Sequence, residues 1–144
     1  MNKKPKLSEH VRRRTQEWFR KAEHELKFLE HAPFDIEDPP TDTACRLAHM
    51  AAEYSLKGYL MLNKKKIRKI HELSDLLDDC IAIHHDKTFE VLRDDCVILT
   101  KYKLELTYPD HIPQVVSLEE AKTAIEKARR IKNLVLDKSR ELGY

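Results

Sequence analysis

Apolar residues recur along most of this chain at steps of three, four or seven, the period of an amphipathic α-helix. In the first such segment, residues 8–30, the apolar face carries Val11, Trp18, Ala22, Leu26 and Leu29. Residues 31–41 then contain three prolines and several acidic residues, a composition that breaks a helix and favours an extended loop. The pattern predicts a first helix that ends in this loop.

A second helix is predicted to begin near Thr41 or Asp42, either of which can cap it by accepting a hydrogen bond from a free backbone N–H. Asn63 is a suitable end. The small residues on its apolar face let a neighbouring helix approach closely, so we expect this helix at the centre of a bundle. That face comprises Ala44, Leu47, Ala48, Ala51, Ser55 and Leu60.

The same period predicts a third helix over residues 71–84 and a fourth over residues 87–106. The clearest start signal precedes the fifth. Ser117 and Glu120 form a capping box, in which the hydroxyl and the carboxylate satisfy backbone donors reciprocally. Gly143 is a natural stop for this last helix.

The amino-acid composition of the chain is typical of long amphipathic helices whose outer faces are exposed to solvent. Hydrophobic residues make up 41% of the chain, charged residues 36%, and there are two glycines. A length of 144 residues suits one domain, residues 1–144. We therefore predict an all-α fold, an antiparallel up-and-down bundle of about five helices.

Basic residues are clustered although the formal net charge is only +2. The clusters lie in residues 3–14, 64–69 and 127–132. Two clusters that converge would form a phosphate-binding surface. Solvated helix faces are the alternative, because acidic runs offset the charge locally.

Cys45, Cys80 and Cys96 have no Cys-x-x-Cys spacing and fall at apolar positions, which suggests reduced thiols in the core. The basic start of the chain is not followed by an apolar run. We expect a cytoplasmic protein without a membrane segment.

Three sequence landmarks, in order, resemble the HEPN family. Residues 48–60, AHMAAEYSLKGYL, are similar to the family's Q-A-A-E-K-A-L-K-A, with Met50 and Tyr54 in place of glutamine and lysine. Residues 70–73, IHEL, are similar to T-H-D-L, and residues 108–110, YPD, to the end of R-Y-P-D. The spacing from Trp18 to Leu26 also suits the family's first helix.

The resemblance implies a helical bundle that is usually a homodimer and is often encoded beside a minimal nucleotidyltransferase in toxin–antitoxin or defence loci. Some members are ribonucleases with an Arg-x4-6-His motif. Here Thr107 replaces the arginine before Tyr108, and no arginine lies at that distance before His111. We therefore expect a module that binds a nucleotide, RNA or a nucleotidyltransferase, and favour binding over catalysis.

Two alternatives remain open. One is a degenerate ribonuclease whose site, at a dimer interface, uses His111, Tyr108 and either Lys101 or Lys103. The other is a purely structural interaction protein. Helices one and four are the expected dimer surface.

Candidate ligand-binding residues lie in the second helix and just after it. His49, Glu53 and Lys57 are spaced four apart and share one helical face. Lys57 either contacts a phosphate or forms an ordinary ion pair with Glu53. His71, at the expected start of the third helix, either binds an anion or caps that helix. The other candidates are Lys64, Lys65, Lys66 and Arg68.

We expect no metal and no cofactor. Di-iron bundles use Glu-x-x-His pairs, and none of the eight histidines has a glutamate three residues before it. Phosphate-binding loops need glycine-rich turns, which two glycines cannot supply.

Overall fold

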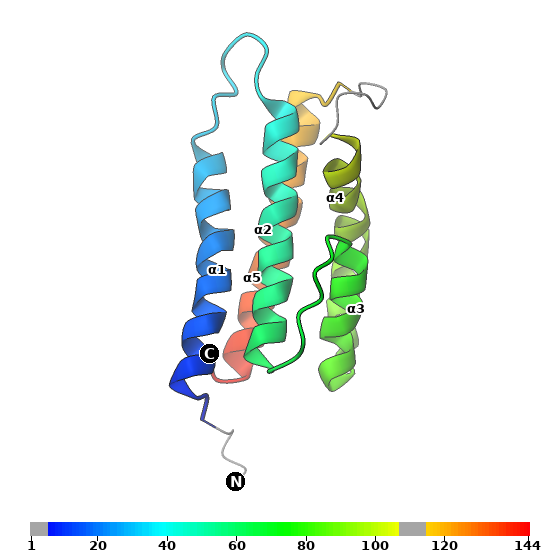
Figure 1. Ribbon diagram of the computed structural model, residues 1–144. Coiled ribbons are helices and arrows are strands. Elements are labelled where there is room, and N and C mark those ends of the chain that lie inside the picture. The colour runs from blue at the N-terminus through cyan, green and yellow to red at the C-terminus, as the bar shows by residue number, and fades with distance from the viewer. Residues whose placement is uncertain (1–5, 107–114) are drawn as a thin grey trace.

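A computed structural model describes residues 6–106 and 115–144, apart from the side chains of residues 104 and 105. This part of the chain contains five α-helices, one 3₁₀-helix and no β-strand, which confirms the all-α prediction. The long helices stand side by side in a bundle (Figure 1). The elements are α1 (Glu9–Glu30), α2 (Thr41–Leu62), α3 (Leu73–His84), η1 (Lys87–Leu92), α4 (Arg93–Glu105) and α5 (Leu118–Glu141).

Local signals define several helix ends. Ser117 Oγ accepts a hydrogen bond from the Glu120 amide at 3.0 Å, which is the serine half of the predicted capping box. The Glu120 carboxylate accepts from the Tyr102 hydroxyl at 3.0 Å and so ties α5 to α4. α5 ends just before Gly143, whose φ of 98° suits glycine. Asn63 ends α2, as expected.

One predicted cap and two predicted helix starts differ from the structure. α2 begins at Thr41, as expected, but Pro40 holds the N-cap position without a side-chain hydrogen bond, and the Thr41 hydroxyl donates instead to the Val116 carbonyl at 2.7 Å. α3 begins at Leu73 rather than His71, because His71 is bound to α2. The fourth helix is interrupted: η1 precedes α4, and 3₁₀ geometry places its buried residues, three apart, in line with each other.

α2 is the core element, as its small residues predicted. Ala48, Ala51 and Ala52 are fully buried, and α2 packs against α1, α3, α4 and α5. The expected core position of Trp18 belongs instead to Phe19, which lies against Gly58. The reason is the course of the stripe through residues 11, 15, 19, 22 and 26, which leaves residue 18 at its margin.

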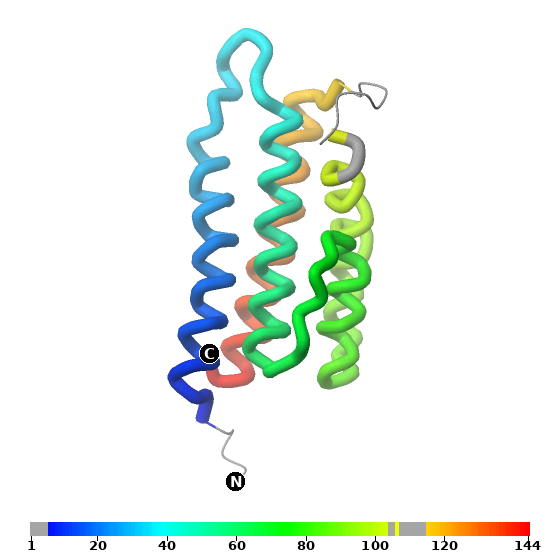
Figure 2. The backbone as a smooth tube through the Cα atoms, in the orientation of Figure 1, coloured from blue at the N-terminus to red at the C-terminus, as the bar shows by residue number. Residues whose placement is uncertain are grey.

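The helices alternate in direction with one departure. The α2–α3 connection, residues 63–72, turns back along α2, so α3 runs in the same direction as α2 (Figure 2). Contacts support this course. His71 lies beside Glu53 near the middle of α2, whereas His84, at the end of α3, lies 3.1 Å from Asn63 at the end of α2.

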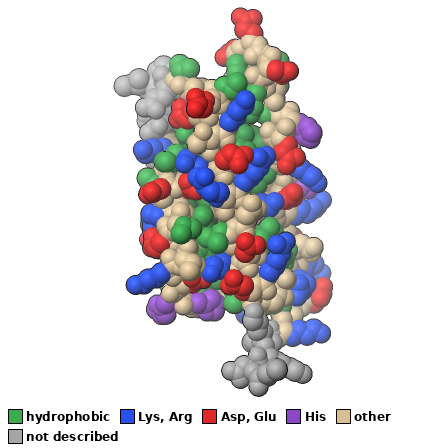
Figure 3. Space-filling view, turned by 180° about the vertical axis from the view of Figure 1, so that it is seen from behind, with side chains coloured by type: hydrophobic (Ala, Val, Ile, Leu, Met, Phe, Trp, Pro, Cys, Tyr) green, Lys and Arg blue, Asp and Glu red, His purple; other side chains and the backbone are tan. Residues whose placement is uncertain are grey.

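The outer faces are strongly polar. Figure 3 shows Lys and Arg side chains interspersed with Asp and Glu over the back of the bundle. Cys45, Cys80 and Cys96 are buried free thiols, as expected. Within the described residues, no helix has the length and apolar character needed to cross a membrane.

Candidate functional site

A buried carboxylate, that of Glu53, lies at the centre of the predicted polar cluster. Lys57 Nζ donates to Glu53 Oε2 at 3.1 Å, and His71 Nδ1 lies 2.7 Å from Oε1. Since an ionised carboxylate only accepts hydrogen bonds, Nδ1 of His71 carries the proton that it donates. Glu53 therefore accepts hydrogen bonds from two side chains, Lys57 of its own helix and His71 of the α2–α3 connection.

His49 continues this cluster one turn earlier in α2. Its Nε2 lies 2.9 Å from the His71 carbonyl oxygen, which can only accept, so Nε2 carries a proton. Nδ1 is buried without a hydrogen-bond partner. Burial lowers the pKa of His49 and outweighs the hydrogen bond to His71 and the charge of Glu53, which raise it. His49 is thus a fully buried residue that secures the α2–α3 connection.

Aromatic rings close the cluster on the α1 side. Trp18 and Tyr54 lie with ring centroids 5.9 Å apart, and Lys57 Nζ is 6.0 Å from the Trp18 centroid. Lys57 is therefore covered by an indole on one side and held by a carboxylate on the other. With only 7% of Lys57 and 2% of Glu53 exposed, this cluster faces the interior, and His71 is its solvent-accessible member.

The basic stretch after α2 is an ordered part of the surface. Arg68 donates to both carboxylate oxygens of Asp79, at 2.9 and 3.0 Å, which fastens the α2–α3 connection to α3. Lys64 adopts a positive φ of 56° where the chain turns. Beyond the turn is a groove of about 380 Å³. It is lined by Leu60, Lys65, Lys66, Arg68, Asp79, Ala82 and Ile83.

This groove, called the basic groove below, has two uncompensated charges. Within residues 6–106 and 115–144, neither Lys65 nor Lys66 has an ion-pair partner, and both are exposed. Arg68 is paired with Asp79. The groove therefore keeps a positive charge beside the apolar side chains of Leu60 and Ile83.

The basic cluster of the last helix differs, because acidic neighbours neutralise it. Asp95 of α4 accepts from Arg130 Nε at 2.9 Å and from Lys127 at 3.3 Å. Arg129 pairs with Glu126, and Lys132 with Glu23. Asp95 was not foreseen as an interacting residue, because it lies 35 residues from Arg130 and no local pattern connects them.

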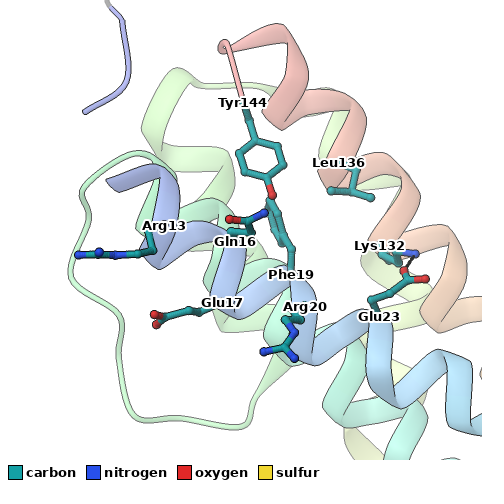
Figure 4. A pocket seen from close by; sticks show the side chains of 9 residues that line it. All are labelled: Arg13, Gln16, Glu17, Phe19, Arg20, Glu23, Lys132, Leu136 and Tyr144. Atoms are coloured by element: carbon teal, nitrogen blue, oxygen red, sulfur yellow. Dashed lines mark hydrogen bonds and ion pairs between the residues drawn. The ribbon is translucent and has the colours of Figure 1, made fainter. Parts of the chain in front are cut away.

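A further groove separates α1 from α5 and has a volume of about 440 Å³ (Figure 4). Figure 4 shows Arg13 and Arg20 at its edge, and Tyr144 above Phe19 on its apolar side. Its acids are engaged, Glu23 by Lys132 and Glu17 by Arg14. The lining combines charges of both signs and is less selective for an anion than the basic groove.

The structure describes only some of the residues that the ribonuclease alternative would use. Thr107, Tyr108 and His111 lie outside the described residues. Lys101 is exposed on α4, and Lys103 lines a small pocket with Arg46 of α2. No sequence pattern other than its charge marked Arg46 as a candidate site residue.

The fold and this cluster define a class: an all-α bundle whose central helix carries a buried Glu–Lys pair that is capped by the following connection. The chain belongs to the HEPN domain family, whose model matches residues 15–139. A crystal structure of an archaeal HEPN homologue is similar, with a TM-score of 0.64 and 24% identity, over 87% of this chain and 97% of that one. At this identity the likeness concerns the fold. No curated protein matches the chain.

Proposed function

We propose that this protein binds a phosphate-bearing ligand, a nucleotide or RNA, in the basic groove. The observation that carries the proposal is the pair Lys65 and Lys66, two exposed lysines without acidic partners beside an apolar wall. Lysine supplies compact charge for phosphate, and the apolar wall supplies a surface for a base or ribose. The groove between α1 and α5 also contains two arginines without an ion-pair partner, Arg13 and Arg20, but two glutamates, Glu17 and Glu23, line it as well.

The buried cluster contributes by positioning. Glu53 and His49 hold His71, and Arg68 holds Asp79, so the α2–α3 connection is fixed at two points before a ligand arrives. A fixed connection reduces the conformational entropy that binding must overcome. The role we propose for Glu53 and Lys57 is therefore to support the groove rather than to contact the ligand.

We further propose a homodimer that acts as the binding half of a two-component system with a minimal nucleotidyltransferase, of toxin–antitoxin or defence type. Membership of the HEPN family supports this context. Exposed apolar side chains on the expected surfaces, Phe28 of α1 and Val97 of α4, support dimerisation there. Sedimentation analysis of a Phe28→Ser, Val97→Ser variant tests the surface, since loss of the dimer is the expected result.

The ligand proposal is tested by titrating the full chain with ATP, GTP and a short single-stranded RNA at low and moderate salt. Calorimetry measures affinity, and gel analysis of the RNA detects cleavage. The test variant is Lys65→Ala, Lys66→Ala. The matched control is Lys27→Ala, Lys122→Ala, which removes the same charge from exposed positions on α1 and α5.

For RNA, we expect the test variant to bind more weakly and to reduce the salt slope by roughly two, one for each lost phosphate contact. The control should retain most of the affinity. An equal loss in both variants would show that only net charge matters and would contradict the groove. Absence of binding by the unmodified chain would favour a structural interaction module, whereas RNA cleavage would favour the ribonuclease.

A further inference from the structure

His71 combines a buried hydrogen-bond partner with an exposed ring. Its Nδ1 lies 2.7 Å from Glu53 Oε1, and its side chain is 56% exposed, whereas that of Glu53 is 3% exposed. Since an ionised carboxylate only accepts hydrogen bonds, the proton of the neutral imidazole resides on Nδ1. The lone pair of the ring is therefore on Nε2, which has no hydrogen-bond partner within residues 6–106 and 115–144.

Two further hydrogen bonds from α2 fix this arrangement. Lys57 Nζ donates to the second oxygen of Glu53 at 3.1 Å, and His49 Nε2 donates to the His71 carbonyl oxygen at 2.9 Å. The carboxylate and the backbone of His71 are thus both held in place. When one imidazole nitrogen donates to a carboxylate, the tautomer and orientation of the ring are set and the other nitrogen becomes more basic.

Among the histidines that the structure describes, His71 alone pairs with a carboxylate. His10 and His85 are exposed and have no such partner. Nε2 of His84 lies 3.1 Å from the Asn63 amide oxygen, and His49 is fully buried. His71 is therefore the described histidine in which a carboxylate fixes one nitrogen while the other is left open to solvent.

The segment before His71 is strongly basic. Five of the six residues from 64 to 69 are lysine or arginine. Lys69, two residues before His71, is exposed and has no ion-pair partner in the described part of the chain. Clustered positive charge raises the local concentration of anions. A reactive nitrogen beside this segment therefore encounters anionic electrophiles preferentially.

We infer that Nε2 of His71 is a nucleophile that accepts a phosphoryl group from an N-phosphate or an acyl phosphate. The Nε2 lone pair attacks phosphorus and forms an N–P bond, while the bond from phosphorus to the leaving group breaks and the leaving group keeps its electron pair. Nδ1 retains its proton, so the ring becomes cationic, and the Glu53 carboxylate stabilises that charge. The inference does not depend on the proposed function, because neither His71 nor Glu53 lines the basic groove.

The probe is potassium phosphoramidate, an N-phosphate whose amino group leaves as ammonia. It is added to the full chain at about pH 8, where imidazole side chains are ordinarily neutral. Peptide mass spectrometry follows the phosphorylation of each histidine in the same sample. We expect His71 to react roughly tenfold or more faster than His10 and His85, the effect of a charge-assisted hydrogen bond on the rate. NMR of the product should place the phosphoryl group on Nε2 of His71.

The test variant is Glu53→Gln with Lys57→Met, which removes the carboxylate charge without leaving the buried ammonium unpaired. The glutamine oxygen can still accept from Nδ1, so the orientation of the ring is kept while the charge is lost. We expect His71 in this variant to react as slowly as His10 and His85. The matched control is Glu17→Gln with Arg14→Met, which removes an exposed ion pair from α1 and should leave the His71 rate unchanged. Circular dichroism checks that both variants fold.

Equal rates at His71, His10 and His85 in the unmodified chain would overturn the inference, whether or not the test variant folds. An unchanged His71 rate in the folded test variant would also contradict it, as would phosphorylation of His71 on Nδ1. A second arm uses acetyl phosphate to identify the donor. Phosphorylation of His71 by both reagents assigns N-phosphates and acyl phosphates as donors, whereas phosphorylation by phosphoramidate alone restricts the site to N-phosphates.

Discussion

Nδ1 of His71 lies 2.7 Å from Oε1 of Glu53, and through this contact the α2–α3 connection is bound to the centre of the bundle. Lys57 occupies the other oxygen of the same carboxylate at 3.1 Å. The ion pair that the four-residue spacing predicts is therefore also the anchor of a segment that runs beside the basic groove. Its removal has consequences for both stability and binding.

Replacing Glu53 by glutamine should destabilise the protein strongly. The Lys57 ammonium is buried, and without the carboxylate it remains an uncompensated charge, which typically costs about 3–5 kcal/mol. Urea unfolding measures the change. Glu17→Gln, which removes an exposed partner of Arg14, should leave the free energy of unfolding nearly unchanged. A similar small effect at both positions would show that Glu53 is not the anchor.

A Cβ atom at position 58 would conflict with the core. On Gly58→Ala it would overlap Cε1 of Phe19 and lie 2.6 Å from Cδ1 of the same ring, which is itself buried. Overpacking of this kind costs about 1–3 kcal/mol, which exceeds the gain of about 1 kcal/mol in helix propensity. Urea denaturation of Gly58→Ala and of Gly58→Ala with Phe19→Leu tests the cause. If the second substitution does not restore part of the stability, the contact is not responsible.

Acidification should weaken the fold through His49. Burial lowers its folded-state pKa below the ordinary value of 6.5, so the unfolded chain takes up a proton at a higher pH than the folded protein does. This residue's contribution is therefore intact above about 6.5 and is lost as the pH falls through the folded-state pKa. Unfolding free energies between neutral and mildly acid pH should decline less steeply in His49→Gln. His10→Gln, at an exposed position, should keep the original slope; equal slopes in all three proteins would refute the assignment.

Asp95 should matter more than any exposed carboxylate of α5. Burial raises its pKa, but the hydrogen bonds from Arg130 and Lys127 outweigh burial and lower it, so its stabilisation is present above about 3.8 and lost as the pH falls further. At neutral pH, Asp95→Asn should cost about 1–3 kcal/mol, toward the lower end because Arg130 is well exposed.

Thermal and urea unfolding of Asp95→Asn give the size of this effect. Asp137→Asn serves as the control, since Asp137 and Arg140 form an exposed pair 3.8 Å apart. Equal stabilities of the two variants would indicate that the α4–α5 ion pairs contribute no more to the free energy of unfolding than an exposed pair does.

The helices, the central position of α2 and the Ser117 cap could all be predicted from the sequence, because each depends on residues within a few turns of one another. Periodicity records which face of a helix is buried, and small residues record where helices approach closely. The Glu53–Lys57 pair belongs to the same kind of information, since a helix brings residues four apart together. The family resemblance, now confirmed, rested on the order of three such local motifs.

Long-range contacts decided the rest. The sequence alone could not show that residues 63–72 turn back along α2, because the contact from His71 to Glu53 spans 18 residues. Nor could it show that Asp95 neutralises one basic cluster while Lys65 and Lys66 remain uncompensated. Charge is a property of each residue, but whether it is available to a ligand depends on which distant side chains lie beside it, and only the packed bundle determines those neighbours.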